Sequence, residues 1–217
     1  NRPTEDLPDP STLTDHPLIR RFDDQIHTVM ENGSLRAIPP FFWDASGRAA
    51  IHGTLTTAQK FLGEEVFLDM LAEPDRIRRA MDWITDANIV LVRHFADLCQ
   101  IPVDTVHVGE CSSCMIGARE WGRFVLPILN KIAAKLGRIR LHSCGASNHI
   151  LESARGIDRL FSLDLGGDTS LGKVRDLFGS DFCISIAPPV KILAHGTRED
   201  LFDWTRKILD DNRGGDL

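Results

Sequence analysis

The segment DTVHVGECSSCMIGAREWGRFVLPILNKIAAKLGRIRLHSCG, residues 104–145, decides the fold of this chain. It opens with a short apolar run, Asp104–Gly109, that predicts a β-strand, and it closes with a second one, Arg138–His142. Between them, Ala118–Leu136 is typical of a helix that stops at Gly137. A strand, a helix and a second strand in this order predict a parallel sheet with crossover helices.

The same alternation extends along the chain in both directions. Apolar runs predict further strands at Ala37–Trp43, Leu160–Leu165 and Phe182–Ile186, with a loop at Asp44–Gly53. Further helices are expected from Pro74 onward, at Leu171–Phe178 and at Leu201–Leu209.

These elements predict an α/β fold, and the expected architecture is a TIM (β/α) barrel. Roughly five strands are recognised, whereas a closed barrel has eight, so we expect the barrel to be incomplete in this chain. An open doubly wound sheet is the alternative. No linker or repeat divides the sequence, and residues 1–217 are therefore expected to form a single domain that lacks N-terminal and C-terminal parts of the barrel.

Composition excludes several classes of protein. The 217 residues are 42% hydrophobic and 26% charged, which is typical of a soluble globular chain. The formal charge of -6 and the lack of a basic cluster argue against a nucleic-acid or anionic-membrane partner. No apolar run approaches the roughly 20 residues that span a bilayer. Five cysteines, an odd number, favour free or metal-bound thiols in a reducing compartment, so we expect a cytoplasmic protein.

Reactive side chains follow three of the predicted strands. Glu110 and Cys111 come directly after the first, His142 and Cys144 end the second, and Asp164 lies in the third. In parallel α/β folds the carboxyl ends of the strands form the active site, so we expect these groups to be functional.

Residues two apart on a strand point to the same side, so His142 and Cys144 can present a nitrogen and a sulfur ligand together. Such mixed ligation with an open position is typical of catalytic zinc. Cys111 and Cys114 are equally compatible with a redox pair or two buried thiols, and Glu110 with a base, a ligand or a solvated acid. Cys99 and Cys183 are interpreted as packing residues.

Several motifs resemble the uroporphyrinogen decarboxylase superfamily, and among its members the zinc-dependent methylcobamide:thiol methyltransferases in particular. The matching stretches, in chain order, are Gly53–Ala58 (GTLTTA), Phe67–Asp69 (FLD), Glu73–Pro74, Leu141–Gly145 (LHSCG), Leu163–Asp164 and Gly196–Leu201 (GTREDL). The LHSCG stretch is similar to the methyltransferase strand with its His-x-Cys-Gly zinc ligands.

The resemblance implies a TIM barrel that holds zinc on His142 and Cys144. Completion of the metal site by Cys111, Cys183 or Glu110 would depart from the family pattern, and of these Cys111 is the candidate ligand. It implies transfer of a methyl group from methylcobalamin, carried by a partner corrinoid protein, to a small thiol. Glu110 and Asp164 are the candidate catalytic residues. The alternatives are a metal-free tetrapyrrole decarboxylase and a non-catalytic member that binds a metal or a corrinoid.

The chain also departs from the family pattern. Ser185–Pro189 (SIAPP) stands where the family has Gly-Asn-Val-Asp-Pro, so the polar groups of that loop are absent. Nothing before Ile38 resembles the Arg-rich segment of the decarboxylases, which disfavours the decarboxylase alternative. The methyltransferases continue beyond the position of Gly215 into a last strand with a further Cys ligand, which accounts for the low strand count.

Overall fold

A computed structural model describes residues 6–31, 33, 37–39, 41–44 and 47–217. Its centre is one parallel sheet of five strands. The strands are β1 (Ala49–His52), β2 (Thr105–Gly109), β3 (Arg138–Ser143), β4 (Leu160–Gly166) and β5 (Cys183–Ala187).

The strands lie side by side in the order in which they occur in the chain, β1 to β5. A doubly wound sheet reverses its strand order at a switch point, whereas a TIM barrel adds each strand next to the previous one. The α/β fold is therefore that of five successive strands of a (β/α) barrel, as the sequence predicts.

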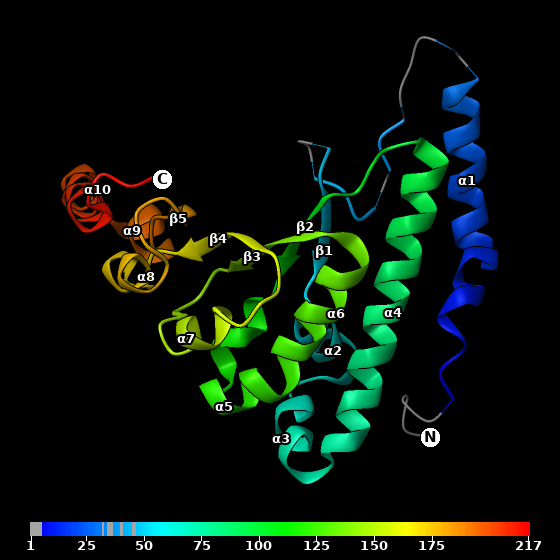
Figure 1. Ribbon diagram of the computed structural model, residues 1–217, viewed down its shortest axis with the longest axis horizontal. Helices are drawn as coiled ribbons and strands as arrows, with labels where there is room; N and C mark the ends of the chain where they lie inside the picture. Colours follow the sequence, from blue (N-terminus) through cyan, green and yellow to red (C-terminus); the bar gives the residue numbers. More distant parts are fainter. Residues whose placement is uncertain (1–5, 32, 34–36, 40, 45–46) are drawn as a thin grey trace.

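Helices connect the strands and cover the sheet (Figure 1). The α-helices are α1 (Pro17–Met30), α2 (Thr54–Leu62), α3 (Glu65–Ala72), α4 (Pro74–Cys99), α5 (Ala118–Glu120), α6 (Leu126–Leu136), α7 (Leu151–Ala154), α8 (Leu171–Phe178), α9 (Val190–His195) and α10 (Arg198–Asn212). Short 3-10 helices occupy Pro10–Asp15 and Cys111–Met115. In Figure 1, α4 lies between α6 and α1, and α8 to α10 gather beside β4 and β5. Within the described part of the chain, no helix has the length and apolar character needed to cross a lipid bilayer.

The two faces of the sheet differ in polarity because side chains alternate along a strand. One face is apolar and packs against the helices in the main core, with Val108, Leu141 and Leu163 almost fully buried. The other face carries half-buried polar side chains, including His142 and Asp164. The register pairs His142 with Asp164 across β3 and β4, which brings reactive groups of neighbouring strands together.

The first strand lies elsewhere than the sequence predicts. The predicted strand Ala37–Trp43, of which residue 40 lies outside the described residues, contributes only an isolated antiparallel bridge from Trp43 to Ala49. The strand that joins the sheet is β1, inside the predicted loop Asp44–Gly53, whose residues 45–46 are also outside the described part. The prediction was wrong because β1 has only four residues and owes its conformation to pairing with β2.

The other predicted elements are confirmed within a few residues. The predicted helix Ala118–Leu136 follows a continuous helical path, but Trp121–Val125 forms a π-helical turn within it. Pro127 follows this turn and has no N–H to donate to the preceding turn, which is a common cause of such irregularity.

Arg175 of α8 ties the C-terminal residues to the barrel, and its loss is expected to destabilise the protein. Its buried guanidinium donates to the side chain of Asn212 and to the backbone carbonyls of Gly179, Ser180, Phe182 and Asp216. Arg175→Met leaves these buried acceptors without a donor and should lower the free energy of unfolding by about 3 kcal/mol. Urea denaturation measures this change.

Arg213→Met is the matched control, because Arg213 forms an exposed ion pair with Asp176. Such pairs contribute roughly 0–1 kcal/mol, so this variant should unfold close to the parent. Equal stability of the two variants would contradict a structural role for Arg175.

Candidate metal site

Three predicted ligands converge at the carboxyl ends of β2 and β3. The ligand atoms of Cys111, His142 and Cys144 all lie within 4.8 Å of one another. His142 lies on β3, and Cys144 is the first residue after that strand. Cys111 begins the 3-10 helix that follows β2. Thiolates bound to one tetrahedral zinc ion at about 2.3 Å lie roughly 3.8 Å apart, so the two sulfur atoms would need to approach by at most about 1 Å.

A polar network extends from His142 across the half-buried face of the sheet. Nδ1 of His142 lies 3.2 Å from Oδ2 of Asp164, and the same oxygen lies 3.0 Å from Nη2 of Arg140. Arg140 also donates from Nε to Nδ1 of His107 over 3.2 Å and from Nη2 to Oγ of Ser185 over 3.3 Å. The imidazole rings of His107 and His142 stack with centroids 5.6 Å apart. His142 is therefore held between a thiol cluster and a carboxylate.

The pKa values of the site follow from these contacts. The Asp164 carboxylate raises the pKa of His142, against the lowering effect of burial, and the Cys111 thiol contributes in the same direction. Burial would raise the pKa of Asp164, but His142 and the charge of Arg140 bring it below its ordinary value. Burial also raises the pKa of the Cys111 thiol and lowers that of His107. A bound cation would reverse the effect on the thiol, because a coordinating thiol is deprotonated.

Nδ1 of His142 is the site's unsatisfied group. It is buried, and its distance from Asp164 suits an ion pair, but the orientation gives it no hydrogen bond with any described residue. Metal-bound histidines usually donate their second ring nitrogen to a carboxylate. The imidazole, two thiols and nearby carboxylate thus have the chemistry that a zinc ion requires.

Glu110 is adjacent to the cluster in sequence, but its carboxylate points to a helix. Its oxygens accept hydrogen bonds from the backbone N–H of Leu55 (3.1 Å) and Thr56 (3.2 Å) and from Oγ1 of Thr56 (3.3 Å). These amides form the N-terminus of α2, where an anion is favourable. Burial raises the pKa of Glu110 to about 7, against these hydrogen bonds. Among the described residues, Glu110 belongs to neither group of converging ligand atoms.

Cys114 lies close to the cluster without joining it. Its thiol donates to the carbonyl of Cys111 over 3.1 Å, and it packs against Gly145, where an added Cβ would lie 2.9 Å from Sγ of Cys114. Cys114 is exposed. Of the two cysteines in the Cys-x-x-Cys motif, only Cys111 belongs to a group of converging ligand atoms among the described residues.

Sequence reasoning missed two members of this network, His107 and Arg140. A signal for Arg140 was present, since it lies two residues before His142 in a strand and so shares its face. For His107, the signal was its position between Val106 and Val108 in a predicted strand, where side chains alternate between the two faces. This position predicts that His107 lies on the face opposite the two valines. The register that pairs His107 with Arg140 comes from the folded sheet.

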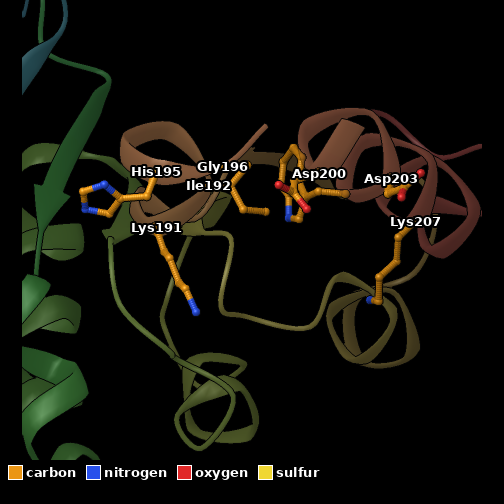
Figure 2. A pocket seen from close by; sticks show the side chains of 8 residues that line it. Lys191, Ile192, His195, Gly196, Asp200, Asp203 and Lys207 are labelled. Atoms are coloured by element: carbon orange, nitrogen blue, oxygen red, sulfur yellow. The ribbon is translucent and has the colours of Figure 1, made fainter. Parts of the chain in front are cut away.

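A hollow of about 540 Å³ lies between α9 and α10, away from the three cysteines. Figure 2 shows the side chain of His195 pointing away from Asp203 and Lys207. None of its lining residues belongs to a group of converging ligand atoms found among the described residues.

Comparisons with known proteins agree with the fold. The profile of a family described as uroporphyrinogen decarboxylase (URO-D) matches residues 50–216. No curated protein sequence matches the chain. Among solved structures, a methyltransferase from Methanosarcina mazei is similar, with a TM-score of 0.67 and 17% sequence identity. The match covers 94% of this chain and 58% of that methyltransferase, and at this identity it is a likeness of fold.

Proposed function

The chain belongs to the uroporphyrinogen decarboxylase family, and from that premise we propose that it is a zinc-dependent methyltransferase that moves a methyl group from a methylated corrinoid to a thiol. The observation that carries the proposal is the convergence of Cys111, His142 and Cys144 within 4.8 Å. The similar fold of a methyltransferase supports the reaction class. The corrinoid partner protein and the small thiol are parts of the same proposal.

Cys111, His142 and Cys144 would hold the metal, and three protein ligands leave one position for the substrate. When bound, zinc supplies the Lewis acidity that makes a thiol ionise near neutral pH, so that its sulfur becomes a good nucleophile. The thiol proton leaves to solvent or to a nearby base. The sulfur lone pair would then form the bond to the methyl carbon, and the electron pair of the broken bond would stay with the corrinoid, which leaves as the donor reduced by two electrons.

The neighbouring residues of the chain position the ligands. Asp164 lies within ion-pair distance of His142 and would orient its ring, Arg140 holds the Asp164 carboxylate, and the ring of His107 stacks on that of His142. Our prediction that Glu110 is a base or ligand stays a prediction. Its hydrogen bonds to α2 favour a positioning role, in which it holds the start of the segment that carries Cys111.

The test is zinc content together with thiol methylation. Protein purified without chelator should contain about one zinc per chain, measured by mass spectrometry. With methylcobalamin and 2-mercaptoethanesulfonate, it should form the methyl thioether. Protein that contains no zinc and does not take it up would overturn the proposal. If that protein releases CO2 from uroporphyrinogen, its function would be that of a decarboxylase instead. Bound zinc with no thioether would favour a non-catalytic member.

Asp164→Asn is expected to weaken zinc binding by roughly 10–100-fold, because the carboxylate that orients His142 loses its charge while its shape is kept. Competition with a zinc-chelating dye measures the affinity. Asp176→Asn changes an exposed carboxylate paired with Arg213 and should bind zinc like the parent. Unchanged zinc affinity in Asp164→Asn would remove Asp164 from the proposed site.

A further inference from the structure

The proposed metal site uses only one of the two cysteines in the Cys-x-x-Cys motif. Cys111 belongs to a group of converging ligand atoms among the described residues, and Cys114 does not. Cys114 is nevertheless adjacent to that group, because an added Cβ at Gly145 would lie 2.9 Å from its Sγ, and Gly145 directly follows the ligand Cys144. An exposed free thiol therefore lies next to the proposed ligands.

The geometry of the motif suits a disulfide between Cys111 and Cys114. Both residues lie in the 3-10 helix Cys111–Met115. Such a helix has three residues per turn and rises about 2.0 Å per residue, so residues three apart have Cα atoms about 6 Å apart. Disulfides usually join Cα atoms that are roughly 4.4–6.8 Å apart. The thiol of Cys114 already folds back towards Cys111, because it donates to the Cys111 carbonyl over 3.1 Å.

Contacts with the rest of the protein hold the backbone of this 3-10 helix. The N–H of Ser112 donates to Oγ1 of Thr56 over 3.1 Å. Just after the helix, the carbonyl oxygen of Ile116 lies 2.9 Å from Nε2 of His149. The two residues between the cysteines, Ser112 and Ser113, are buried. The two thiols are therefore kept within reach of each other, and rotation of their side chains is enough to join them.

The third cysteine of the cluster, Cys144, lies on a separate turn. The carbonyl of Gly145 accepts hydrogen bonds from Oγ of Ser147 and from Oγ1 of Thr169, both over 3.2 Å. Cys144 is thus held by contacts of its own turn, whereas the other two cysteines share one turn of helix.

We propose that Cys111 and Cys114 form a reversible disulfide that removes Cys111 from the zinc ion and so inactivates the site in the presence of hydroperoxides. This regulation rests on the proposed zinc-dependent function, because the loss of a metal ligand is its consequence. Thiolate is the form of cysteine that binds metals, so a disulfide-bonded Cys111 no longer serves as a ligand. Only His142 and Cys144 would remain of the three proposed ligands.

The oxidation consumes one hydrogen peroxide for each disulfide. The exposed sulfur of Cys114 attacks the peroxide, the O–O bond breaks, one water leaves, and Cys114 becomes a sulfenic acid. The thiolate sulfur of Cys111 then attacks the sulfur of Cys114, the S–O bond breaks, and the released hydroxide takes up a proton to become a second water. The two sulfur atoms lose two electrons, which the peroxide oxygens gain. A dithiol reductant restores both thiols by exchange.

The test treats the zinc-loaded protein with a small excess of hydrogen peroxide, which catalase then removes. A chelating dye follows zinc release, and labelling of the thiols before and after reduction, read by tandem mass spectrometry, locates the disulfide. The parent should release zinc, join Cys111 to Cys114 and bind zinc again after treatment with dithiothreitol. In the oxidised state its zinc affinity should fall about as far as in Cys111→Ser, by ~100-fold.

Cys114→Ser should bind zinc like the parent before oxidation, but under peroxide it should release zinc at least tenfold more slowly, because Cys111 has lost its partner. Cys183→Ser is the matched control, since it removes a half-buried thiol outside the ligand groups and should release zinc at the parent's rate. Protein that binds no zinc at all would overturn the proposed function. With the zinc site intact, the redox regulation is overturned if Cys114→Ser releases zinc as fast as the parent, or if the oxidised parent joins Cys111 to Cys144 instead.

Discussion

Replacing His142 with Ala is expected to lower the zinc affinity of the protein by about 100-fold or more and to abolish methyl transfer. Structural zinc sites with four ligands bind with roughly 10–16 kcal/mol, so each ligand contributes on the order of 3 kcal/mol, or a factor of ~100. His142 also links the two thiols to Asp164, since it belongs to both groups of converging ligand atoms among the described residues. Its loss should therefore remove a ligand and also break the link between the two thiols and Asp164.

Serine variants of the cysteines locate the remaining ligands. Cys144→Ser and Cys111→Ser should each weaken zinc binding by a similar factor, whereas Cys114→Ser should leave it within about twofold, because Cys114 lies outside the ligand groups. Zinc competition with a chelator measures all four variants. If Cys111→Ser binds zinc like Cys114→Ser, then Cys111 is not a ligand and the site has only His142 and Cys144 from this chain.

Gly53→Ala is expected to lower the free energy of unfolding by about 3–5 kcal/mol. A Cβ at Gly53 would lie 2.1 Å from Cδ of Glu110, so the buried carboxylate would have to leave its place at the N-terminus of α2. Overpacking of a core costs about 1–3 kcal/mol, and the hydrogen bonds from Leu55 and Thr56 would be lost in addition. Urea denaturation measures the effect.

A double-mutant cycle isolates the contact between these two residues. Glu110→Ala alone removes the carboxylate that caps α2 and should also be destabilising, by roughly 3 kcal/mol. Because Gly53→Ala already displaces Glu110, the double variant should be more stable than the sum of the single changes predicts, by about 1–3 kcal/mol. Gly122→Ala, where the added Cβ makes only an ordinary 3.8 Å contact, is the control. Strict additivity of Gly53→Ala and Glu110→Ala would contradict a direct clash.

Much of the fold follows from local sequence patterns. Strands β2 and β3 are predicted within one residue because apolar side chains alternate along them and Gly137 separates β3 from the helix before it. The long helix α4 begins at Pro74 as expected, since proline fits the first turn of a helix. β1 was missed because its four residues are less apolar than Phe41–Trp43, and only the ladder with β2 makes them a strand.

The sequence by itself determined that His142 and Cys144 share one side of a strand end, because the two-residue period of a strand is a local property. It could not place Cys111 beside them, or Asp164 and His107 beside the imidazole, since these contacts depend on the register between strands whose paired residues are more than 20 positions apart in the chain. It also could not show that Glu110 is buried against α2. Only the tertiary structure decided these features, because parallel pairing and helix packing bring together residues that have no local relation in the chain.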